Sequence, residues 1–269
     1  MDFEKEVSKL IDIHCHILPN VDDGPSNYFD VIEMANQAVM TGITHLFATP
    51  HHMNGRYENT KTEILAGVRS LNQILQNEKI PLSVHCGQEL RIHREIFHTL
   101  DLNEVLTLDN QGKYLLVELP SKEIPDYTLD VIYELLLKGI TPILVHPERN
   151  MMFHENPNLL FELVQVGALT QLTSGSIIGH FGKKIKNFSE KMMEHHLAHF
   201  VANDAHNIHS RGFFLQEAYE VIIRKFGVKQ SAYFNNNAEL LLNGEKFQRE
   251  EPMRIRNKFL AFFENTFGN

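Results

Sequence analysis

The stretch "IDIHCHILPNVDDG" (residues 11–24) places two histidines at the end of an apolar run and two aspartates a few residues later. On a β-strand, alternate side chains project to the same face, so His14 and His16 point one way and Cys15 points the other. Cys15 is then a packing residue, and Asp23 lies in the loop after the strand. Two imidazoles with a carboxylate close behind indicate the first part of a metal site.

Short β-branched runs recur along the chain and alternate with longer segments of helical periodicity. This alternation predicts parallel strands joined by helices, which is an α/β fold. Seven strand candidates, each followed by a helical candidate, favour an irregular (β/α) barrel over an open doubly wound sheet. The predicted strands are residues 9–15, 43–49, 82–87, 114–119, 141–146, 169–173 and 199–203.

Two of the predicted helices carry recognisable ends. Ser26 precedes "NYFDVIEMANQAVM" and Gly42 follows it, which is typical of an N-cap and a C-terminal glycine. Asp126 and Gly139 stand at the two ends of "DYTLDVIYELLLKG" in the same way. We therefore predict that both segments are helices with these residues at their ends.

The length of 269 residues suits a single domain, because one (β/α) barrel takes about 250 residues. We find neither a repeat of fixed period nor a linker rich in Pro, Gly and Ser. We expect one domain over residues 1–269, with residues 1–10 as an N-terminal extension and residues 212–269 as helices packed on the barrel. The aromatic tail "KFLAFFENTFGN" is predicted to be a core-packing helix rather than a partner-docking segment.

The composition narrows the class of protein. A hydrophobic fraction of 43% with 22% charged residues is ordinary for a soluble globular chain. The net charge of −9 argues against a nucleic-acid partner, since surfaces that bind DNA or RNA are usually basic. We recognise neither a signal peptide nor an apolar run of about 18 residues. We therefore expect no membrane insertion and a cytoplasmic location in which the two cysteines stay reduced.

The carboxyl ends of the strands decide the function, because the active face of a parallel barrel is built there. Six of the seven predicted strands end in a metal-binding side chain, while strand 169–173 offers no obvious ligand. His52, beside His51, is an open alternative, Asp22 is interpreted as a loop residue, and the other histidines are expected to be structural or exposed. Imidazoles with carboxylates suit Mn²⁺, Fe²⁺ or Zn²⁺. The candidate ligands are His14, His16, Asp23, His51, Glu89, Glu118, His146, Asp204 and His206.

The motifs "DIHCHILPNVDDG", "ATPHH", "GQEL", "VHPER" and "NDAH", in this order, resemble the PHP (polymerase and histidinol phosphatase) superfamily. The resemblance is strongest to its bacterial metal-dependent protein-tyrosine phosphatases of the CpsB/YwqE type. It implies a distorted (β/α)7 TIM-like barrel that holds up to three metal ions, with manganese the usual one for activity. The family's ligands fall on the same nine positions, including Glu118, where many PHP proteins place a histidine.

The resemblance also implies a reaction and two further site residues. Arg149, three residues after His146, and Arg211, five residues after His206, match arginines that hold the substrate phosphate. A metal-activated hydroxide would attack phosphotyrosine, as two-metal sites do with phosphate esters. The residue or water that protonates the leaving group stays open.

A cysteine-dependent phosphatase mechanism does not fit this sequence. Such enzymes need a cysteine, five intervening residues and an arginine in one phosphate-binding loop. Four residues separate Cys86 from Arg91, and the sixth residue after Cys15 is Val21. We therefore predict that Cys15→Ser and Cys86→Ser leave activity nearly intact. The glycine-rich "TSGSIIGHFG" (residues 173–182) lacks the Lys-Ser/Thr of a nucleotide loop and is predicted to be a flexible active-site loop.

Rival functions remain open at this point. The same metal centre would serve a histidinol-phosphate phosphatase or another small-molecule phosphoesterase. A nuclease of the PHP type fits an acidic chain without a polymerase domain poorly. A non-catalytic, metal-binding regulatory module belongs to another class. The resemblance implies a phosphotyrosine protein substrate, namely a membrane-associated bacterial tyrosine autokinase that controls capsule or exopolysaccharide synthesis.

Overall fold

The computed structural model of the chain describes residues 9–101, 103–246 and 249–255. The described strands form two parallel sheets, one in the order β1-β2-β4 and one in the order β3-β5-β6-β7-β8-β9. All seven predicted strands are present, and β3 and β5 are two further short ones. The strands are β1 (Leu10–Cys15), β2 (Ile43–Ala48), β3 (His51–His52), β4 (Ser83–Cys86), β5 (Glu89–Arg91), β6 (Tyr114–Glu118), β7 (Thr141–Val145), β8 (Leu169–Thr173) and β9 (Phe200–Ala202).

The two sheets are parts of one wall, because β2 runs on into β3 and β4 runs on into β5. β2 pairs with β4, and β3 pairs with β5. Pro50 separates β2 from β3, since proline has no N–H to donate to a neighbouring strand. Gly87 separates β4 from β5. A Cβ at this position would lie 2.7 Å from Leu108 Cδ2 and 2.8 Å from Thr49 Cγ2. Local proline and glycine chemistry thus explains the two extra strands.

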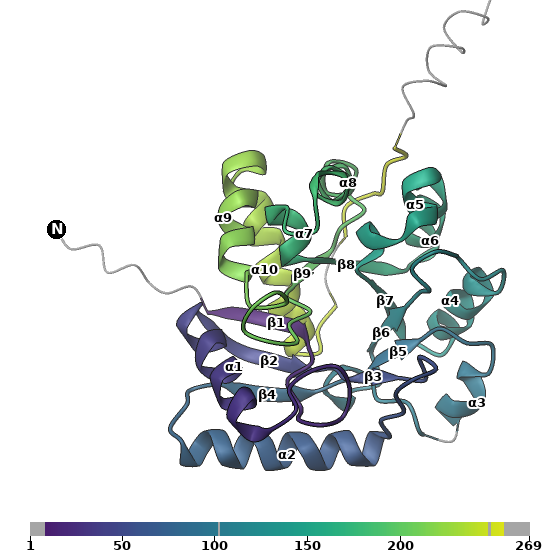
Figure 1. Ribbon diagram of the computed structural model, residues 1–269. Helices are drawn as coiled ribbons and strands as arrows, with labels where there is room; N and C mark the ends of the chain where they lie inside the picture. The colour runs from purple at the N-terminus through teal and green to yellow at the C-terminus, as the bar shows by residue number, and fades with distance from the viewer. Residues whose placement is uncertain (1–8, 102, 247–248, 256–269) are drawn as a thin grey trace, which may run out of the picture.

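The first and last strands meet on the other side of the wall. The His14 carbonyl accepts from Asp204 N at 2.9 Å, and His16 N donates to the Ala205 carbonyl at 2.8 Å. Figure 1 shows the strands around a common centre with helices outside them, as expected for a distorted (β/α) barrel. All ladders are parallel, so the carboxyl ends of the strands share one end, here called the mouth, and the amino ends form the base.

The helices that cover the strands have the following bounds. They are α1 (Tyr28–Met40), α2 (Lys61–Asn77), α3 (Ile96–Asp101), α4 (Thr128–Leu137), α5 (Met151–Glu155), α6 (Pro157–Val166), α7 (Ser174–Ile178), α8 (Lys183–Glu194), α9 (Leu215–Phe226) and α10 (Val228–Leu242), with short 3₁₀ turns at η1 (Leu108–Asn110) and η2 (Pro147–Arg149). None of the helices in the described residues has the length and apolar character that a membrane crossing needs.

Apolar residues fill both faces of the strands. Inside the ring, Phe47 and Phe200 are fully buried in a cluster that also contains Leu241 from α10. Helix α10 therefore helps to close the base. Outside the ring, residues such as Met34 of α1 and Leu71 of α2 pack in the larger core cluster. Each large apolar side chain that is fully buried contributes about 1.5–3 kcal/mol, so the two layers hold the mouth on a rigid frame.

Two predicted helix caps are wrong by one residue. Asn27, not Ser26, caps α1, because its side chain accepts from Asp30 N at 3.0 Å. Tyr127, not Asp126, precedes α4, and it makes no side-chain cap. The carboxylate of Asp126 instead pairs with Arg94 at 2.6 Å. The neighbouring residue thus caps α1, whereas α4 begins without a side-chain cap.

The structure agrees in part with what the sequence predicts for the two ends of the chain. Leu10 already belongs to β1, so the predicted N-terminal extension of residues 1–10 is too long by at least one residue. Helices α9 and α10 lie within the predicted C-terminal helical region. The tail "KFLAFFENTFGN" (residues 258–269), predicted to be a core-packing helix, lies outside the described residues.

Candidate metal centre

Two histidines and two carboxylates from distant strands meet at the mouth. The Nε2 atoms of His14, in β1, and His16, directly after it, lie 3.2 Å apart. Glu89 Oε2, from β5, lies 3.5 Å and 3.3 Å from these two atoms. Asp204 Oδ1, directly after β9, lies 3.5 Å and 3.4 Å from them. All four residues are buried, so the contacts form in a site that excludes bulk water.

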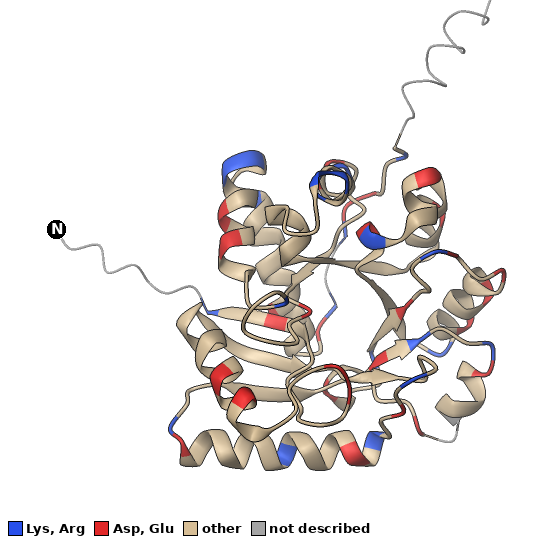
Figure 2. Ribbon diagram, viewed as in Figure 1, with Lys and Arg blue, Asp and Glu red and all other residues tan. Residues whose placement is uncertain are grey.

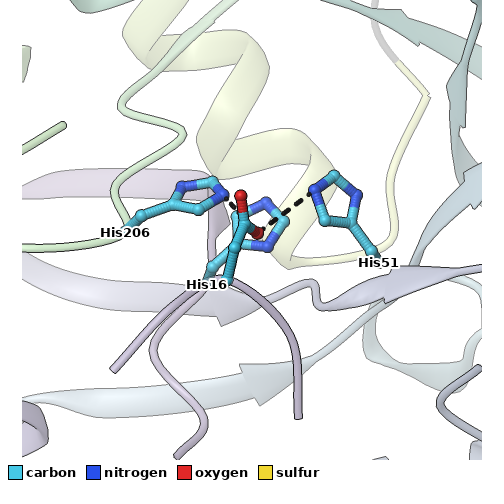
Figure 3. Close-up of side chains that lie close together, drawn as sticks. His16, His51 and His206 are labelled. Atoms are coloured by element: carbon cyan, nitrogen blue, oxygen red, sulfur yellow. Dashed lines mark ion pairs between the residues drawn. The ribbon is translucent and has the colours of Figure 1, made fainter. Parts of the chain in front are cut away.

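Three histidines and the loop aspartate form an adjoining group. Figure 3 shows His16, His51 and His206 with their rings close together. Asp23 Oδ1 lies 3.5 Å from His51 Nε2 and 3.1 Å from His206 Nε2. The His16 and His206 rings stack with centroids 3.8 Å apart. The first βα loop therefore brings Asp23 back over the mouth, as predicted from the sequence.

Glu118 and His146 complete the set around Glu89. His146 Nε2, after β7, lies 2.9 Å from Glu89 Oε1. His51 Nδ1 lies 2.7 Å from Glu89 Oε2 and 3.9 Å from Glu118 Oε2, at the end of β6. Glu89 thus contacts four histidines, counting His14 and His16. The structure brings all nine predicted residues together at one mouth.

Several buried polar atoms at the mouth lie in ion pairs but make no well-aligned hydrogen bond, which bears on whether the site fits metal ions. Among the described residues, the buried side-chain atoms without a hydrogen bond of acceptable geometry include four at the mouth that belong to predicted ligands: His51 Nδ1, Glu89 Oε2, Glu118 Oε2 and His206 Nε2. An unsatisfied buried polar group costs about 1–3 kcal/mol, so a cation coordinated by these atoms would stabilise the site. Candidate donor atoms lie within 4.8 Å of one another in three groups: His16, Asp23, His51 and His206; His14, His16 and Glu89; His51, Glu89 and Glu118. Imidazole and carboxylate donors fit first-row divalent metals, although each ligand role stays a prediction.

The central carboxylates are held ionised by the charges around them. Burial alone would raise the pKa of Glu89, but the charges of His14 and His51 lower it well below its usual value. Burial would also raise the pKa of Asp204, and Arg149 and His14 lower it well below the usual value. Both groups are therefore available as anionic ligands near neutral pH.

Two histidines are held in the neutral form that binds metals. Burial and the charge of Arg149 lower the pKa of His146 to about 4. Burial and the charge of His16 lower the pKa of His206 to about 4. Burial and the nearby Glu89 raise the pKa of Glu118 to about 7, because the two carboxylates repel each other when both are ionised. A divalent cation would relieve that repulsion.

Both predicted phosphate-binding arginines face this centre. Arg149 donates to Asp204 Oδ2 at 2.8 Å. Arg211 donates to both Asp204 oxygens at 3.0 Å and to Asp23 at 3.4 Å. Their side chains are 23% and 30% exposed, so a phosphate arriving from solvent can reach them.

Two of the predicted ligands have strained backbones. His146 (φ 36°) and Asp204 (φ 52°) adopt the left-handed region that non-glycine residues avoid. Such positions cost on the order of 1–3 kcal/mol each and need support from their surroundings. Beside Asp204, the Asp12 carboxylate accepts from Asn203 N at 3.0 Å and from Asn203 Nδ2 at 2.8 Å. These bonds fix the turn that aims Asp204 into the mouth.

Comparison with known proteins agrees with this geometry. Residues 10–243 match the family model for capsular polysaccharide synthesis, CpsB/CapC. The chain belongs to the CpsB/CapC family. It is 46% identical to tyrosine-protein phosphatase YwqE of Bacillus subtilis over 255 residues, which covers 94% of this chain and 100% of the relative. It is 39% identical to the putative tyrosine-protein phosphatase CapC of Staphylococcus aureus over 243 residues, covering 90% of this chain and 95% of CapC.

A solved structure of the CpsB/CapC family superimposes closely. It comes from work on YwqE from Bacillus subtilis and CpsB from Streptococcus pneumoniae, which are described as unique metal-dependent tyrosine phosphatases. The TM-score is 0.90 at 45% identity, and the match covers 92% of this chain and 100% of the other. The fold implied by the resemblance is therefore confirmed.

Asp22 is a residue that the sequence-based interpretation missed. It was expected to be an ordinary loop residue, but its Oδ2 lies 2.6 Å from His16 Nδ1. It also accepts from His51 N at 3.1 Å and from Gly24 N at 2.9 Å. Asp22 therefore orients His16 with Nε2 toward the centre, which is the usual role of a carboxylate behind a metal-binding histidine. The "DD" pair in the opening stretch was the available signal.

Strand β8, which offers no predicted ligand, supports the site in a different way. Gln171 Oε1 lies 2.9 Å from His14 Nδ1, so Gln171 orients His14 as Asp22 orients His16. Arg91, in β5, was considered only as part of a cysteine motif. Its guanidinium lies 3.0 Å from Glu118 Oε2 and partly balances that carboxylate.

The glycine-rich segment 173–182 is a short helix followed by a turn rather than a continuous loop. Helix α7 begins at Ser174, and Ser176 Oγ donates to the buried Glu148 at 2.6 Å. Thr173 N donates to the same carboxylate at 2.9 Å. At the turn, the guanidinium of Arg149 lies over the Phe181 ring at 5.6 Å. The segment therefore contacts the site through Arg149, as the prediction of an active-site position requires.

The remaining histidines and the cysteines have protein partners or lie away from the mouth. His52 Nδ1 accepts from Asn59 N at 3.1 Å, and His52 belongs to none of the three donor groups in the described residues. Cys15 and Cys86 are buried. Burial raises the pKa of Cys86 to about 11 and that of Cys15 well above its usual value, so neither thiol is an available nucleophile.

Proposed function

We propose that this protein is a metal-dependent protein-tyrosine phosphatase, that is, a phosphoric monoester hydrolase. The convergence of nine ligand-type side chains and two arginines at one mouth carries the proposal. It is supported by relatives of the CpsB/CapC family that are named tyrosine-protein phosphatases. The buried, protonated cysteines argue for a reaction that does not use a thiol.

The cofactor that we propose is Mn²⁺, with up to three ions and with iron or zinc as alternatives. His14, His16, Asp23, His51, Glu89, Glu118, His146, Asp204 and His206 would hold the ions. When bound, such ions neutralise phosphate charge and lower the pKa of water enough for it to attack near neutral pH.

The two arginines bind and orient the phosphate in this proposal. Each now shares Asp204, and the planar guanidinium suits two oxygens of a phosphate equally well. Asp204 keeps the guanidinium groups of Arg149 and Arg211 pointed at the centre before substrate arrives. This preorganisation means that little side-chain entropy is lost when phosphate binds.

The physiological partner in this proposal is a phosphotyrosine protein of capsule or exopolysaccharide synthesis, namely a membrane-associated bacterial tyrosine kinase. We place the phosphatase in the cytoplasm, at the face of the membrane where such a kinase would act. In the view of Figure 2, acidic and basic residues are interspersed over the outer helices. Together with the net charge of −9, this supports a protein substrate over a nucleic acid.

A direct assay separates this function from its rivals. Initial rates are measured on a phosphotyrosine peptide and on histidinol phosphate, with metal-stripped protein before and after adding Mn²⁺. Metal-dependent turnover of the peptide with little turnover of histidinol phosphate is expected. The reverse preference would make the protein a small-molecule phosphatase. Metal binding without turnover of either would make it a non-catalytic regulatory module.

A further inference from the structure

Two histidines outside the mouth bring ring nitrogens together near the base of the barrel. His45 lies in β2 and His85 lies in β4, and these strands pair in parallel with Phe47 opposite His85. Because alternate residues of a strand share a face, His45 lies on the same face as Phe47 and beside His85. His45 Nδ1 lies 3.0 Å from His85 Nε2. Neither histidine is a predicted ligand at the mouth, so the proposed chemistry does not account for the pair.

Asp109 and Phe47 hold the ring of His85 in place. Asp109 Oδ1 lies 3.4 Å from His85 Nδ1, and Phe47 stacks on the ring with centroids 5.0 Å apart. The carboxylate favours the proton on His85 Nδ1, so Nε2 presents its lone pair toward His45. A carboxylate behind a histidine is the usual support of a metal-binding imidazole. The same arrangement orients one of the predicted ligands at the mouth.

The pair differs from histidines that are neighbours only in the sequence. His195 and His196 follow each other in the chain, but their Nδ1 atoms contact different backbone carbonyls. His45 and His85 lie 40 positions apart, and the fold aims one nitrogen of each at the other. Two converging imidazole nitrogens form a chelating pair, whereas two diverging ones do not.

The base pair is accessible and suited to a cation. The side chain of His85 is 21% exposed, so an ion can reach it from solvent. Burial, aided by the charges of His85 and Lys9, lowers the pKa of His45. His45 is therefore neutral near pH 7, and the neutral imidazole is the form that binds metals.

We propose that His45 and His85 form a second metal site, which binds one late first-row divalent ion such as Zn²⁺ and ties β2 to β4. The ion takes the place of the hydrogen between the two nitrogens. That hydrogen moves from His45 Nδ1 to Nε2 of the same ring, so no proton is released. Zn–N bonds of about 2.0–2.1 Å place two nitrogens on one ion about 2.9–3.4 Å apart, from a square to a tetrahedral angle. The observed 3.0 Å fits this range without a movement of either strand.

The base site is expected to be weaker than the mouth and to take no part in the chemistry there. In the part of the chain that the structure describes, the groups of three or more donors include neither His45 nor His85, so water would fill the remaining positions on the ion. Imidazole ligands favour Cu²⁺, Ni²⁺ and Zn²⁺ over Mn²⁺. The base site thus takes a different ion from the one proposed for the mouth, and the inference does not rest on the proposed function.

The test counts bound Zn²⁺ by equilibrium dialysis in the presence of excess Mn²⁺. His45→Gln and His85→Gln should each bind one Zn²⁺ fewer per chain than wild type. The double variant should lose no more than either single variant, because one ion needs both rings. His195→Gln is the matched control and should bind as much Zn²⁺ as wild type, since its ring contacts a backbone carbonyl. Activity with Mn²⁺ should match wild type in every variant.

The unfolding temperature gives a second measurement, because the strands hold the two histidines together only in the folded chain. Added Zn²⁺ should raise it more in wild type and in His195→Gln than in His45→Gln. If His85→Gln fails to fold, His45→Gln alone decides.

The proposal is overturned if the single variants bind as much Zn²⁺ as wild type, which would leave only an N–H···N hydrogen bond at the base. Loss of two ions in the double variant, or loss of one in His195→Gln, would also overturn it. A large loss of Mn²⁺-dependent activity in His45→Gln would make the pair part of the catalytic site instead. If no phosphotyrosine peptide is hydrolysed but the differences in Zn²⁺ persist, the proposed function fails and the base site stands.

Discussion

Histidines occur at two levels of the barrel, and the two levels differ in how many donor side chains converge around them. At the mouth, His51 Nδ1 lies 2.7 Å from Glu89 without forming a well-aligned hydrogen bond. Nearer the base, His45 Nδ1 lies 3.0 Å from His85 Nε2, and His85 Nδ1 lies 3.4 Å from Asp109. The pair near the base meets one carboxylate, whereas the mouth gathers three groups of metal-type donor atoms within 4.8 Å of one another in the described residues. The convergence of donor side chains from several strands, rather than the number of histidines, therefore indicates the predicted metal site.

The largest expected effect comes from removing the charge of Glu89 at the mouth. The same change at Asp109, near the base, is the control. Glu89→Gln keeps the shape at the mouth but loses the central carboxylate, so we expect activity to fall by about 10³-fold or more, with loss of bound metal. Asp109→Asn is the same chemical change near the base, and asparagine tolerates its φ of 51°. Activity with Mn²⁺ and metal content by elemental analysis are measured for both variants.

Equal losses in Glu89→Gln and Asp109→Asn would erase the distinction between the two levels. Full activity in Glu89→Gln with normal metal content would show that the central carboxylate is not a ligand. A loss in Asp109→Asn alone would move the functional histidines to the base.

The next effect tests the arginines that face the mouth. Arg149→Ala should lower kcat/KM for a phosphotyrosine peptide by about 10²–10³-fold, because one charged contact to the phosphate is lost. Metal content should stay normal, since Arg149 is not a predicted ligand. Arg94→Ala, which removes an exposed arginine paired with Asp126, is the control and should behave as wild type. Normal catalysis by Arg149→Ala would remove this residue from the phosphate site.

A smaller effect is expected from Asp22, which contacts the predicted ligand His16 from behind. Asp22→Asn weakens the acceptor that orients His16, so the Mn²⁺ concentration for half-maximal activity should rise by about 10- to 100-fold. The maximal rate at saturating Mn²⁺ should change much less. Asp30→Asn, an acid-to-amide change in α1, serves as the control. An unchanged Mn²⁺ requirement in Asp22→Asn would show that the 2.6 Å contact does not tune the site.

The strands and the convergence of the candidate ligands could be predicted because they depend on local patterns. A strand of alternating or apolar residues that ends in His or Glu places that side chain at the mouth, whatever the rest of the chain does. His14, His146 and Asp204 follow this rule. The resemblance then supplied the arginines. Because all the predicted ligands except Asp23 lie at strand ends, identifying the strands was enough to group them.

The supporting residues could not be predicted in the same way. Gln171 meets His14 across 157 positions in the sequence, and a buried glutamine on a strand has no distinctive pattern. Glu148 is buried by Thr173 and Ser176 from another segment, so its role depends on tertiary packing. The division of β2 from β3 also depends on how Pro50 meets its neighbours in the barrel. These features are set by long-range contacts that strand periodicity does not encode.

The smallest expected effect concerns His199, next to β9 at the base. Its Nδ1 accepts from Thr170 N at 3.1 Å, and the charged group that acts on it is Arg249, a cation. Burial, aided by Arg249, lowers its pKa to about 3, whereas burial at the mouth is outweighed by carboxylates that raise the pKa of His16. His199 therefore stays neutral when folded but takes up a proton in the unfolded chain below about pH 6.5.

The unfolded state thus binds more protons than the folded state between about pH 6 and pH 4, and the stability due to His199 falls as the pH falls. One proton corresponds to about 1.4 kcal/mol per pH unit in the free energy of unfolding. In His199→Asn, the asparagine Oδ1 can replace Nδ1 as the acceptor for Thr170 N, and the titrating group is gone. Urea unfolding of the metal-free proteins is measured at pH 6, 5 and 4. The free energy of unfolding of the variant should depend on pH less steeply than that of wild type, by about 1.4 kcal/mol per pH unit. Equal slopes would mean that the base histidine is already charged in the folded protein, and that the two levels do not differ in the electrostatics inferred for them.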